Sequence, residues 1–374
     1  MAKKPRTVLG ALSLLIAIGI AICTFWPFQP FPPNQVSWLQ GSNGIRFDCA
    51  GVVLSSEPLQ QSSDSAPSRG NASLEIWLKP TNIYPVSTVL DFYEPRNPFH
   101  FQLRQYQDGL IVSRDSLALN GKPKRAKIDF DHGLQRDRLI LITLTSSPAG
   151  TLLYLDGVLK SAYPNFRFTP GDLTGQIVLG TSPVDSQPWT GEIHGLAIYA
   201  ETLTPPIVQK HFQDDWNANG LATSQDDLRT TGSTIYAFQE RQGNTIHAMG
   251  SSGPDLQIPA HFRVPHQAFL KTLSAAFEPD WSYVVDALSN IIGFLPFGVC
   301  LCGYLACTRP LRSAILLTVI ISFVFSLSIE SIQAYLPQRV SDLTDVLTNT
   351  IGGALGAFLA GILKNHGLLG GSGQ

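Results

Sequence analysis

Four stretches of the chain are apolar for long enough to cross a lipid bilayer. The first is residues 8–26, which as a helix rising about 1.5 Å per residue would span about 28 Å, close to the thickness of the hydrocarbon core. Three more lie near the C-terminus, at residues 283–307, 313–332 and 346–363. The pattern predicts an α-helical transmembrane bundle of four helices, with a long polar segment between the first helix and the second.

Positive residues at the ends of these stretches predict the direction of the helices. They lie before the first stretch, between the second and third, and after the fourth: Lys3, Lys4, Arg6, Arg309, Arg312 and Lys364. Four spans place all three groups on one side, and short loops rich in Lys and Arg stay in the cytoplasm. We therefore expect a multi-pass membrane protein, with residues 1–7 and 365–374 in the cytoplasm and residues 27–280 outside.

A cleaved signal peptide is the alternative interpretation of residues 8–26. The run is long, it ends at Trp26, and it lacks a cleavage site of the small-x-small type. These features favour a helix that stays in the membrane.

The segment outside the membrane has the alternation of polar and apolar residues that is typical of β-strands. Residues 27–35 form a proline-rich spacer, and residues 36–220 contain short alternating runs separated by turns. Asp156-Gly157 lies between two such runs and predicts a tight hairpin. The pattern predicts an all-β sandwich, with one helix near residues 204–216. Residues 221–280 contain further β-rich runs, which either complete the sandwich or form a separate juxtamembrane hairpin.

Composition excludes some classes of function. Charged residues make up 14% of the chain and the net charge is -2, so no basic surface for nucleic acid is expected. Of the five cysteines only Cys49 lies outside the apolar segments, so the outer domain cannot form a disulfide of its own. Cys300 and Cys302 are one residue apart and lack zinc-finger spacing.

Polar residues recur inside the three C-terminal apolar stretches. They fall at helical spacing on one face of each predicted helix, near its outer end: Asp286, Asn290 and Gly293; Ser326, Glu330 and Gln333; Asp345, Asn349, Gly352 and Gly356. Arg339 and Asp342 lie in the short loop between the last two stretches, and Arg339 is the expected counter-charge for the acids. Ionisable groups in hydrocarbon are costly and usually mark function, so we predict a polar pocket at this depth.

The alternative interpretation is that these polar groups only hold the helices together. Small residues at positions 352, 356 and 360 permit close helix approach, and Pro296 favours a kink in the second helix. We assign Pro296, Gly298, Gly352 and Gly356 to helix packing. The eight polar residues assigned to the pocket are Asp286, Asn290, Glu330, Gln333, Arg339, Asp342, Asp345 and Asn349.

The β-rich region resembles the concanavalin A-like, laminin-G-like jelly roll. The matching runs are residues 74–80, 153–158, 177–180 and 191–199, and the resemblance covers about residues 36–216. It implies a jelly-roll sandwich that binds a carbohydrate or a protein. Many relatives have an acidic residue where this sequence has His194, so the resemblance leaves calcium binding open.

The C-terminal region resembles the VanZ-like family, over about residues 281–364. The matching motifs are Asn290-x-x-Gly-Phe-x-Pro-Phe-Gly298, Ser328-x-Glu-x-x-Gln333 and Arg339-x-x-Asp-x-x-Asp-x-x-x-Asn-x-x-Gly352. The family is bacterial and is named for a teicoplanin-resistance protein. The resemblance implies a location in the bacterial inner membrane and a role in the cell envelope, with a possible link to glycopeptide resistance, but no particular reaction.

No catalytic motif stands out in the outer domain. Glu75 and Glu192 lie alone on predicted strands and are expected to face outward, and Asp131, His132, Asp137 and Asp156 are expected in turns rather than around a metal. Five aromatic residues could stack on sugars if they are exposed, namely Trp77, Tyr93, Tyr106, Trp189 and Tyr199. We name no catalytic residue and no cofactor.

Two functional hypotheses remain. In the first, the outer domain binds a glycan or a protein, and the bundle binds a lipid-linked envelope component. In the second, the protein is an intramembrane enzyme in which Glu330 or Asp345 acts as general base and Arg339 holds a phosphate. A transporter is a weaker third hypothesis, because four spans without a repeat would need to oligomerise.

Overall fold

The computed structural model describes residues 3–60, 70–83, 86–94, 97–117, 123–184, 187–216, 233–250, 253–267, 269–273 and 281–366. The chain divides into two compact units. One is Phe31–His266, and the other combines Met1–Pro30 with Gln267–Gln374. We call the first the outer unit, after the side of the membrane on which the sequence predicts it, and the second the helical unit.

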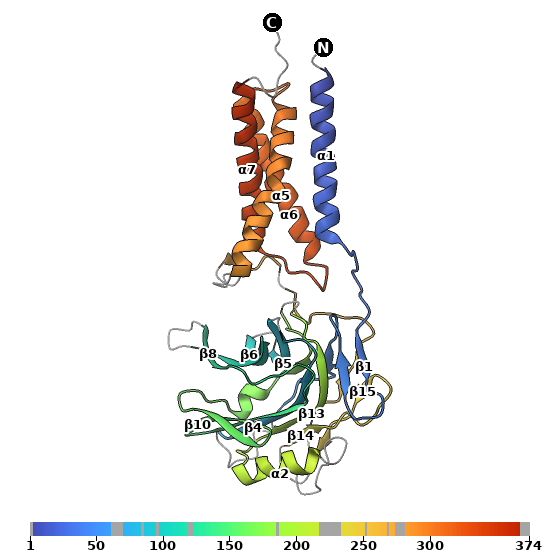
Figure 1. Ribbon diagram of the computed structural model, residues 1–374, viewed down its shortest axis with the longest axis vertical. Helices are drawn as coiled ribbons and strands as arrows, with labels where there is room; N and C mark the ends of the chain where they lie inside the picture. The colour runs from blue at the N-terminus through green and yellow to red at the C-terminus, as the bar shows by residue number, and fades with distance from the viewer. Residues whose placement is uncertain are drawn as a thin grey trace. The chain divides into compact units, whose positions relative to one another are not determined.

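The outer unit is a sandwich of two antiparallel sheets (Figure 1). The first sheet has the order β1 (Val36–Trp38), β2 (Ile45–Phe47), β13 (Gly191–Tyr199), β4 (Ala72–Pro80), β9 (Ile140–Ser147), β10 (Gly150–Leu155) and β11 (Val158–Tyr163), with β14 (Thr234–Tyr236) and β16 (Met249–Gly250) joined beside β13. The second sheet has the order β15 (Thr245–Ile246), β17 (Leu256–Gln257), β3 (Val53–Ser55), β12 (Gln176–Leu179), β5 (Val86–Glu94), β6 (Asn97–Tyr106), β7 (Gly109–Leu117) and β8 (Pro123–Phe130). The predicted all-β sandwich is therefore confirmed.

Alternation along the strands builds the core between the sheets. Leu74, Ile76 and Leu78 of β4 are almost fully buried and pack with aromatic residues such as Phe47 and Trp189. The opposite face of β4 is also buried, because α2 (Pro205–Trp216) covers the outside of the first sheet (Figure 1). The predicted hairpin at residues 156–157 joins β10 to β11, and both of its turn residues have a positive φ.

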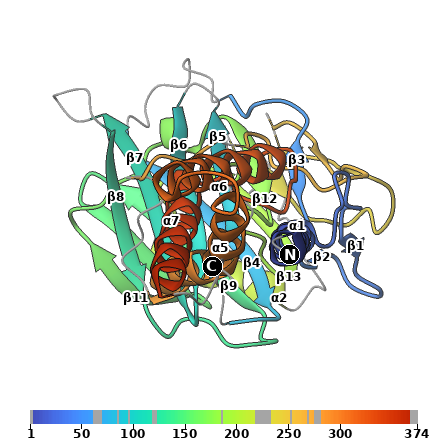
Figure 2. The same cartoon turned by 90° about the horizontal axis from the view of Figure 1, so that it is seen from above.

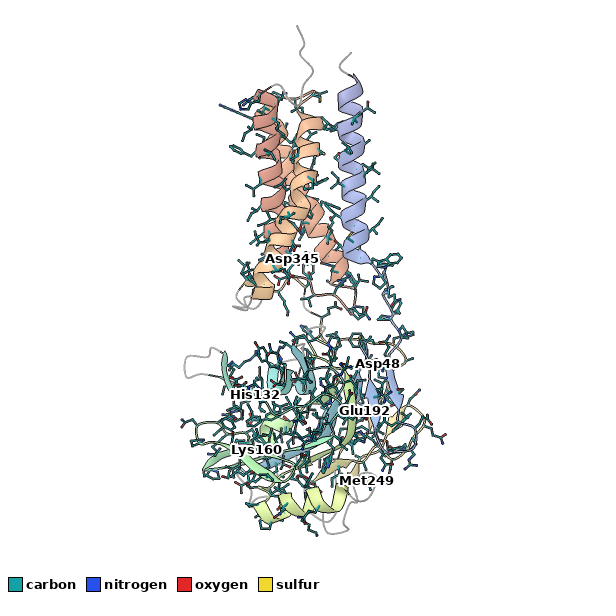
Figure 3. The ribbon with its side chains drawn as sticks, viewed as in Figure 1. Asp48, His132, Lys160, Glu192, Met249 and Asp345 are labelled. Atoms are coloured by element: carbon teal, nitrogen blue, oxygen red, sulfur yellow. The ribbon has the colours of Figure 1, made fainter. Side chains whose placement is uncertain are left out.

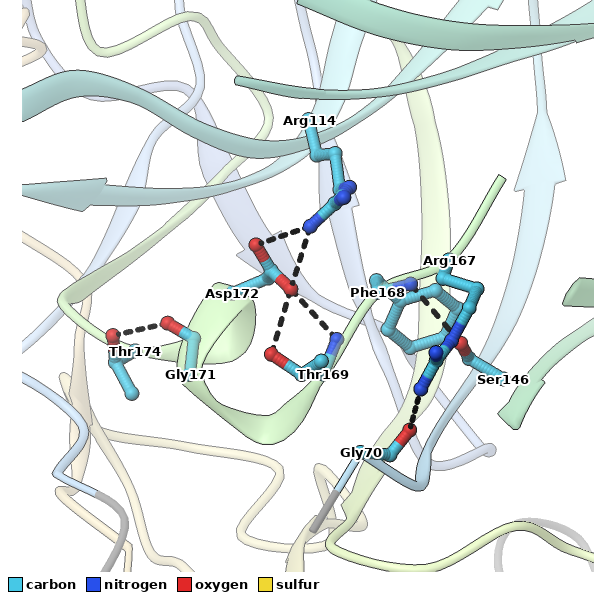
Figure 4. A network of polar contacts seen from close by, with 9 residues as sticks. All are labelled: Gly70, Arg114, Ser146, Arg167, Phe168, Thr169, Gly171, Asp172 and Thr174. Carbon is cyan, nitrogen blue, oxygen red and sulfur yellow. Dashed lines mark hydrogen bonds and ion pairs between the residues drawn. The ribbon is translucent and has the colours of Figure 1, made fainter. Parts of the chain in front are cut away.

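A polar network supports the one-turn helix η1 (Pro170–Leu173) that precedes β12. Asp172 accepts hydrogen bonds from the backbone N–H of Thr169 at 2.7 Å and from its hydroxyl at 2.8 Å, and it pairs with Arg114 of β7 at 3.2 Å (Figure 4). Ser146 of β9 accepts a hydrogen bond from the backbone N–H of Phe168 nearby. The buried Phe168 is thereby fixed between the two sheets.

Residues beyond 220 complete the sandwich instead of forming a separate hairpin. Strands β14 and β16 extend the first sheet, and β15 and β17 pair with β3 in the second. The outer unit thus continues to His266, past the boundary at residue 220 that the sequence suggested. Residues 217–232 lie outside the described part of the chain.

The helical unit contains α1 (Lys3–Phe25), α5 (Trp281–Leu305), α6 (Leu311–Gln333) and α7 (Leu343–Asn365). All four are long and apolar enough to cross a membrane. Figures 1 and 2 show α5 lying between α7 and α1. The N-terminal end of α1 and the C-terminal end of α7 lie at the same end of the bundle.

Glycines allow α5 and α7 to approach closely. A Cβ atom added to Gly356 would overlap the carbonyl oxygen of Leu295, and one added to Gly352 would overlap that of Ile291. Gly298 of α5 faces the backbone of Gly353 in the same way. Pro296 lies inside α5, within this contact region. The four residues that the sequence assigned to helix packing therefore lie at or beside the α5–α7 contact.

Candidate functional site: a polar pocket in the helical unit

The polar residues of the three C-terminal helices gather at one end of the bundle. They come from the first half of α5, the last turns of α6 and the first turns of α7. Figure 3 labels Asp345 at this end, opposite the end where α1 begins and α7 finishes. The helical periodicity of the sequence thus places side chains from all three helices at a common level.

Four of the predicted residues line a pocket of about 340 Å³ between α5, the α6–α7 loop and the start of α7. They are Asp286, Asn290, Asp342 and Asp345. The remaining lining residues are Tyr283, Ala287, Ser289, Val340 and Thr344. Sequence reasoning did not single these out, although Tyr283 lies one helical turn before Asp286 and Thr344 precedes Asp345.

Hydrogen bonds fix the pocket wall. The Asn290 amide donates to the Asp345 carboxyl group at 2.8 Å and reaches the Thr348 hydroxyl at 3.4 Å, which joins α5 to α7. Asp342 is the N-cap of α7, because its carboxyl oxygen accepts the backbone N–H of Thr344 at 2.7 Å. Asp286, in contrast, is exposed, so its carboxyl group is accessible for binding.

Glu330 and its neighbours lie outside the pocket, in the interior of the bundle. Glu330 is 1% exposed and accepts the backbone N–H of Asp342 at 2.8 Å. With its amide nitrogen turned toward this carboxyl group, Gln333 donates to it at 2.9 Å. On α7, Asn349 donates to the hydroxyl of Ser326 on α6 at 2.9 Å. These three residues connect α6 to α7 and to the loop between them. Of the eight predicted residues, four therefore line the pocket, three join the helices beside it, and Arg339 belongs to neither set.

Arg339 does not neutralise the acids. Its guanidinium donates to the backbone carbonyl of Trp26 at 2.9 Å, and within the described residues no carboxylate lies within 4.0 Å of it. The last carbonyls of a helix have no partner within the helix and carry partial negative charge, which attracts a cation. The expected counter-charge is therefore used to hold the end of α1.

The pocket wall offers carboxyl, amide and hydroxyl groups, and no Lys, Arg or His is among its lining residues. Such a wall suits a neutral polar group or a cation better than an anion. Within the described residues no three His, Cys, Asp or Glu side chains are grouped so that they could hold a metal ion.

In the outer unit, Glu75 is buried instead of facing solvent. It is 0% exposed and accepts hydrogen bonds from Thr143 at 2.9 Å and Tyr199 at 3.3 Å, and it contacts His211 of α2 at 2.8 Å. The side chain does point away from the core between the sheets, as alternation predicts. It is buried because α2 lies over that face, which the strand pattern alone could not reveal.

Glu192 is also buried, in a cluster of charges on β13 and its neighbours (Figure 3 labels Glu192). It pairs with Arg46 of β2 at 2.6 Å, Lys79 of β4 at 3.3 Å and His194 at 3.1 Å. Burial tends to raise the pKa of Glu192, but its hydrogen bonds with Arg46 and His194 and the charge of Lys79 lower it overall. Burial lowers the pKa of His194 despite the neighbouring carboxylate. The three partners compensate the buried charge of Glu192.

Most of the candidate sugar-stacking aromatics belong to the core. Trp77, Tyr93, Trp189 and Tyr199 are at most 5% exposed, whereas Tyr106 is 43% exposed. Tyr106 lies at the end of β6, at the turn into β7. Among the five, only Tyr106 presents a ring on which a sugar could stack.

Two family models match different parts of the chain. Residues 55–209 match Laminin_G_3, of the concanavalin A-like lectin/glucanases superfamily, and residues 233–364 match VanZ/LLP1. The second match begins within the last strands of the outer unit and continues to the end of the helices. No curated protein matches the chain.

Solved structures are similar to the chain at low identity. The receptor-binding domain of botulinum neurotoxin D is 14% identical, with 48% of this chain and 47% of that chain covered and a TM-score of 0.35. The binding domain of Paraclostridial Mosquitocidal Protein 1 is 12% identical, with 50% and 48% covered and a TM-score of 0.37. The chain spans about half the length of these structures.

Proposed function

We propose that this chain, which joins a Laminin_G_3 domain to a VanZ/LLP1 region, is a membrane protein of the bacterial cell envelope that recognises envelope components on its outer side. The four long apolar helices support the membrane location. The positive residues at the helix ends favour cytoplasmic termini, in which case Phe31–His266 lies outside the cytoplasm. The polar end of the bundle then faces the outer leaflet.

The observation that carries the proposal is the pocket between α5 and α7. It lies within helices that are otherwise apolar, where polar groups are rare and usually functional. The exposed Asp286 and the Asn290–Asp345 pair give it hydrogen-bonding groups that a headgroup at the outer leaflet could use. We therefore assign it to the polar part of a lipid-linked envelope component.

The charge of the pocket limits which chemical group of that component can bind in it. Three Asp residues line the pocket without a basic lining residue, and Arg339 is occupied at the end of α1. A sugar or amine group fits this wall, whereas a phosphate would meet like charge. The intramembrane-enzyme hypothesis required Arg339 to bind a phosphate. The contact of Arg339 with Trp26 does not support that role.

Lipid retention by the whole protein tests the pocket. The protein would be placed in nanodiscs that contain lipids with amine, sugar and anionic headgroups and then released from them. Native mass spectrometry would identify the lipids that remain bound to it. Asp286→Asn should lower the retention of amine or sugar lipids several-fold, because it removes the negative charge and one of the two acceptor oxygens without disturbing a hydrogen bond of the wall. Asp131→Asn, at an exposed position of the outer unit, is the matched control. Equal retention by the wild type and Asp286→Asn would reject the pocket.

The outer unit is proposed to bind a carbohydrate or a protein, on the strength of its Laminin_G_3 match. The test is binding of the nanodisc-embedded protein to a panel of bacterial polysaccharides and peptidoglycan fragments, with calcium and with a chelator. Saturable binding that Tyr106→Ala weakens would support a sugar site at the β6–β7 turn. Binding to protein partners alone would show that the unit recognises proteins.

A further inference from the structure

Four basic side chains gather at the end of the bundle where α1 begins and α7 ends (Figure 1). Arg6 lies in the first turn of α1, and Lys364 lies in the last turn of α7. Arg309 and Arg312 lie where α5 turns into α6. All four side chains are exposed, and we call them the basic cluster.

Contacts with the end of α5 bring side chains of α1 and α7 together. The guanidinium of Arg6 lies over the ring of Tyr304, 5.2 Å from the ring centroid. The ammonium of Lys364 donates to the backbone carbonyl of Ala306 at 2.6 Å. Both contacts fall within residues 304–312, which also contain the two arginines of the α5–α6 turn. Three separate parts of the chain thus place positive charge at one point of the bundle.

No acid of the helical unit compensates this charge. The sequence has no Asp or Glu in residues 1–47, 287–329 or 346–374. Within the described residues, no carboxylate lies within 4.0 Å of a side chain of the basic cluster. Like charges repel, so the cluster is unfavourable unless an anion lies between its members.

The acids of the described part of the helical unit lie at the opposite end, around the pocket and the α6–α7 loop (Figure 3). They are Asp286, Glu330, Asp342 and Asp345. The two ends of the bundle therefore have opposite charge and suit different ligands.

The basic cluster keeps hydrogen-bond donors available for an anion. Stacking on Tyr304 occupies the face of the Arg6 guanidinium, and its N–H groups point outward in the plane. Lys364 has three N–H donors and gives one of them to Ala306. Arg309 and Arg312 are exposed beside them. Guanidinium groups bind phosphate with two parallel hydrogen bonds, and an ammonium adds a further charge.

Helix α1 has little protein around it. Only 6% of the residues in its apolar stretch are buried, compared with 44% in α7. A ligand that touches Arg6 and the α5–α6 turn together would add a link between α1 and the other helices at this end.

We propose that the basic cluster binds the phosphate of an anionic phospholipid, which holds the start of α1 against α5 and α7. A lipid fits better than a free ion, because the four side chains lie at the ends of membrane-spanning helices, at the level of the headgroups, where anionic lipids attract basic residues. The inference does not depend on the pocket, which lies at the other end of the bundle.

Lipid retention by the whole protein tests the binding. The protein would be released from nanodiscs of phosphatidylcholine and phosphatidylglycerol, and native mass spectrometry would identify the lipids still bound. The wild type should retain phosphatidylglycerol in preference, and the double variant Arg309→Gln, Arg312→Gln should lower its retention about tenfold. Arg309→Lys, Arg312→Lys keeps the charge and should restore part of it.

The matched control is the double variant Arg136→Gln, Arg263→Gln, which removes two exposed positive charges from the outer unit and should retain phosphatidylglycerol like the wild type. Equal retention by the wild type and by Arg309→Gln, Arg312→Gln would overturn the site. The pocket is tested with a different variant and with different headgroups, so the two proposals can fail separately.

Hydrogen exchange tests the link to α1. Exchange at residues 6–12 should be slower in nanodiscs that contain phosphatidylglycerol than in phosphatidylcholine alone, and Arg309→Gln, Arg312→Gln should remove the difference. Inorganic phosphate added to the phosphatidylcholine nanodiscs should not reproduce the protection. Equal protection by inorganic phosphate would overturn the assignment to a lipid, and equal exchange in the two kinds of nanodisc would overturn the link.

Discussion

Glu75 makes three polar contacts beneath α2, and its removal should have a large effect on the outer unit. Glu75→Ala leaves Thr143, Tyr199 and His211 beside a cavity that water cannot easily fill, and the loss of one partner of a buried polar group costs about 3 kcal/mol. Urea unfolding followed by tryptophan fluorescence would measure it. Glu57→Ala, at an exposed position, should change stability by less than about 0.5 kcal/mol. Similar midpoints for the two variants would contradict the role of Glu75.

His194 should make the outer unit less stable in mild acid. Burial lowers its pKa below the ordinary 6.5, so the unfolded chain binds a proton more readily than the folded chain. Stability is then lost as the pH falls through the unfolded value of about 6.5 toward the folded value. Glu192 contributes to acid sensitivity only at lower pH, because its pKa is lowered below 4.5.

The measurement compares melting temperatures at pH 7.5 and pH 5.5. His194→Gln should lose less stability than the wild type over this interval. His132→Gln is an informative contrast, because the hydrogen bond to Asp108 raises the pKa of His132, and that stabilisation is lost as the pH rises. An unchanged pH dependence in His194→Gln would show that His194 is not the group responsible.

At the scale of elements, the contact of α5 with α7 depends on the absence of side chains. A Cβ atom at Gly356 would meet backbone atoms of α5, which cannot move aside without separating the helices. Gly356→Ala should therefore destabilise the bundle by about 1 to 3 kcal/mol. Gly293→Ala is the matched control, because no atom lies within 4 Å of the position where its Cβ would stand. There the substitution should be neutral or stabilising, since Ala favours a helix.

Unfolding of both glycine variants in mixed micelles, with increasing SDS, would measure the difference. If Gly293→Ala were as harmful as Gly356→Ala, the effect would come from the loss of glycine itself and not from close helix packing.

At the scale of the whole molecule, two native cysteines report the direction of the chain across the membrane. Cys49 is exposed in the outer unit, and Cys307 is exposed at the turn between α5 and α6. With single-cysteine variants, a membrane-impermeant maleimide should label Cys49 in cells whose outer barrier is opened. It should label Cys307 only after the inner membrane is permeabilised. Labelling of Cys307 alone in unpermeabilised cells would reverse the proposed topology.

The sequence by itself determined the features that depend on local pattern. The length of the apolar runs predicts α1, α5, α6 and α7, and strict alternation with Asp156-Gly157 predicts strands and a hairpin. Helical spacing also places Asp286 with Asn290, and Asp345 with Asn349, on common faces. These conclusions need only neighbours along the chain, so periodicity suffices.

Only the tertiary structure decided which partners these residues have. The contact of Glu75 with His211 of α2, that of Arg339 with Trp26 and the hydrogen bond from the N–H of Asp342 to Glu330 each join residues of different elements. Strands β14 to β17 likewise find their places only through pairing with β13 and β3. The side-chain amide of Gln267 donates to the backbone carbonyl of Leu336, and the sequence did not predict this, because such an amide looks like any polar residue in a connecting segment. Long-range pairing depends on the packing of whole elements, and the local pattern of polar and apolar residues does not predict it.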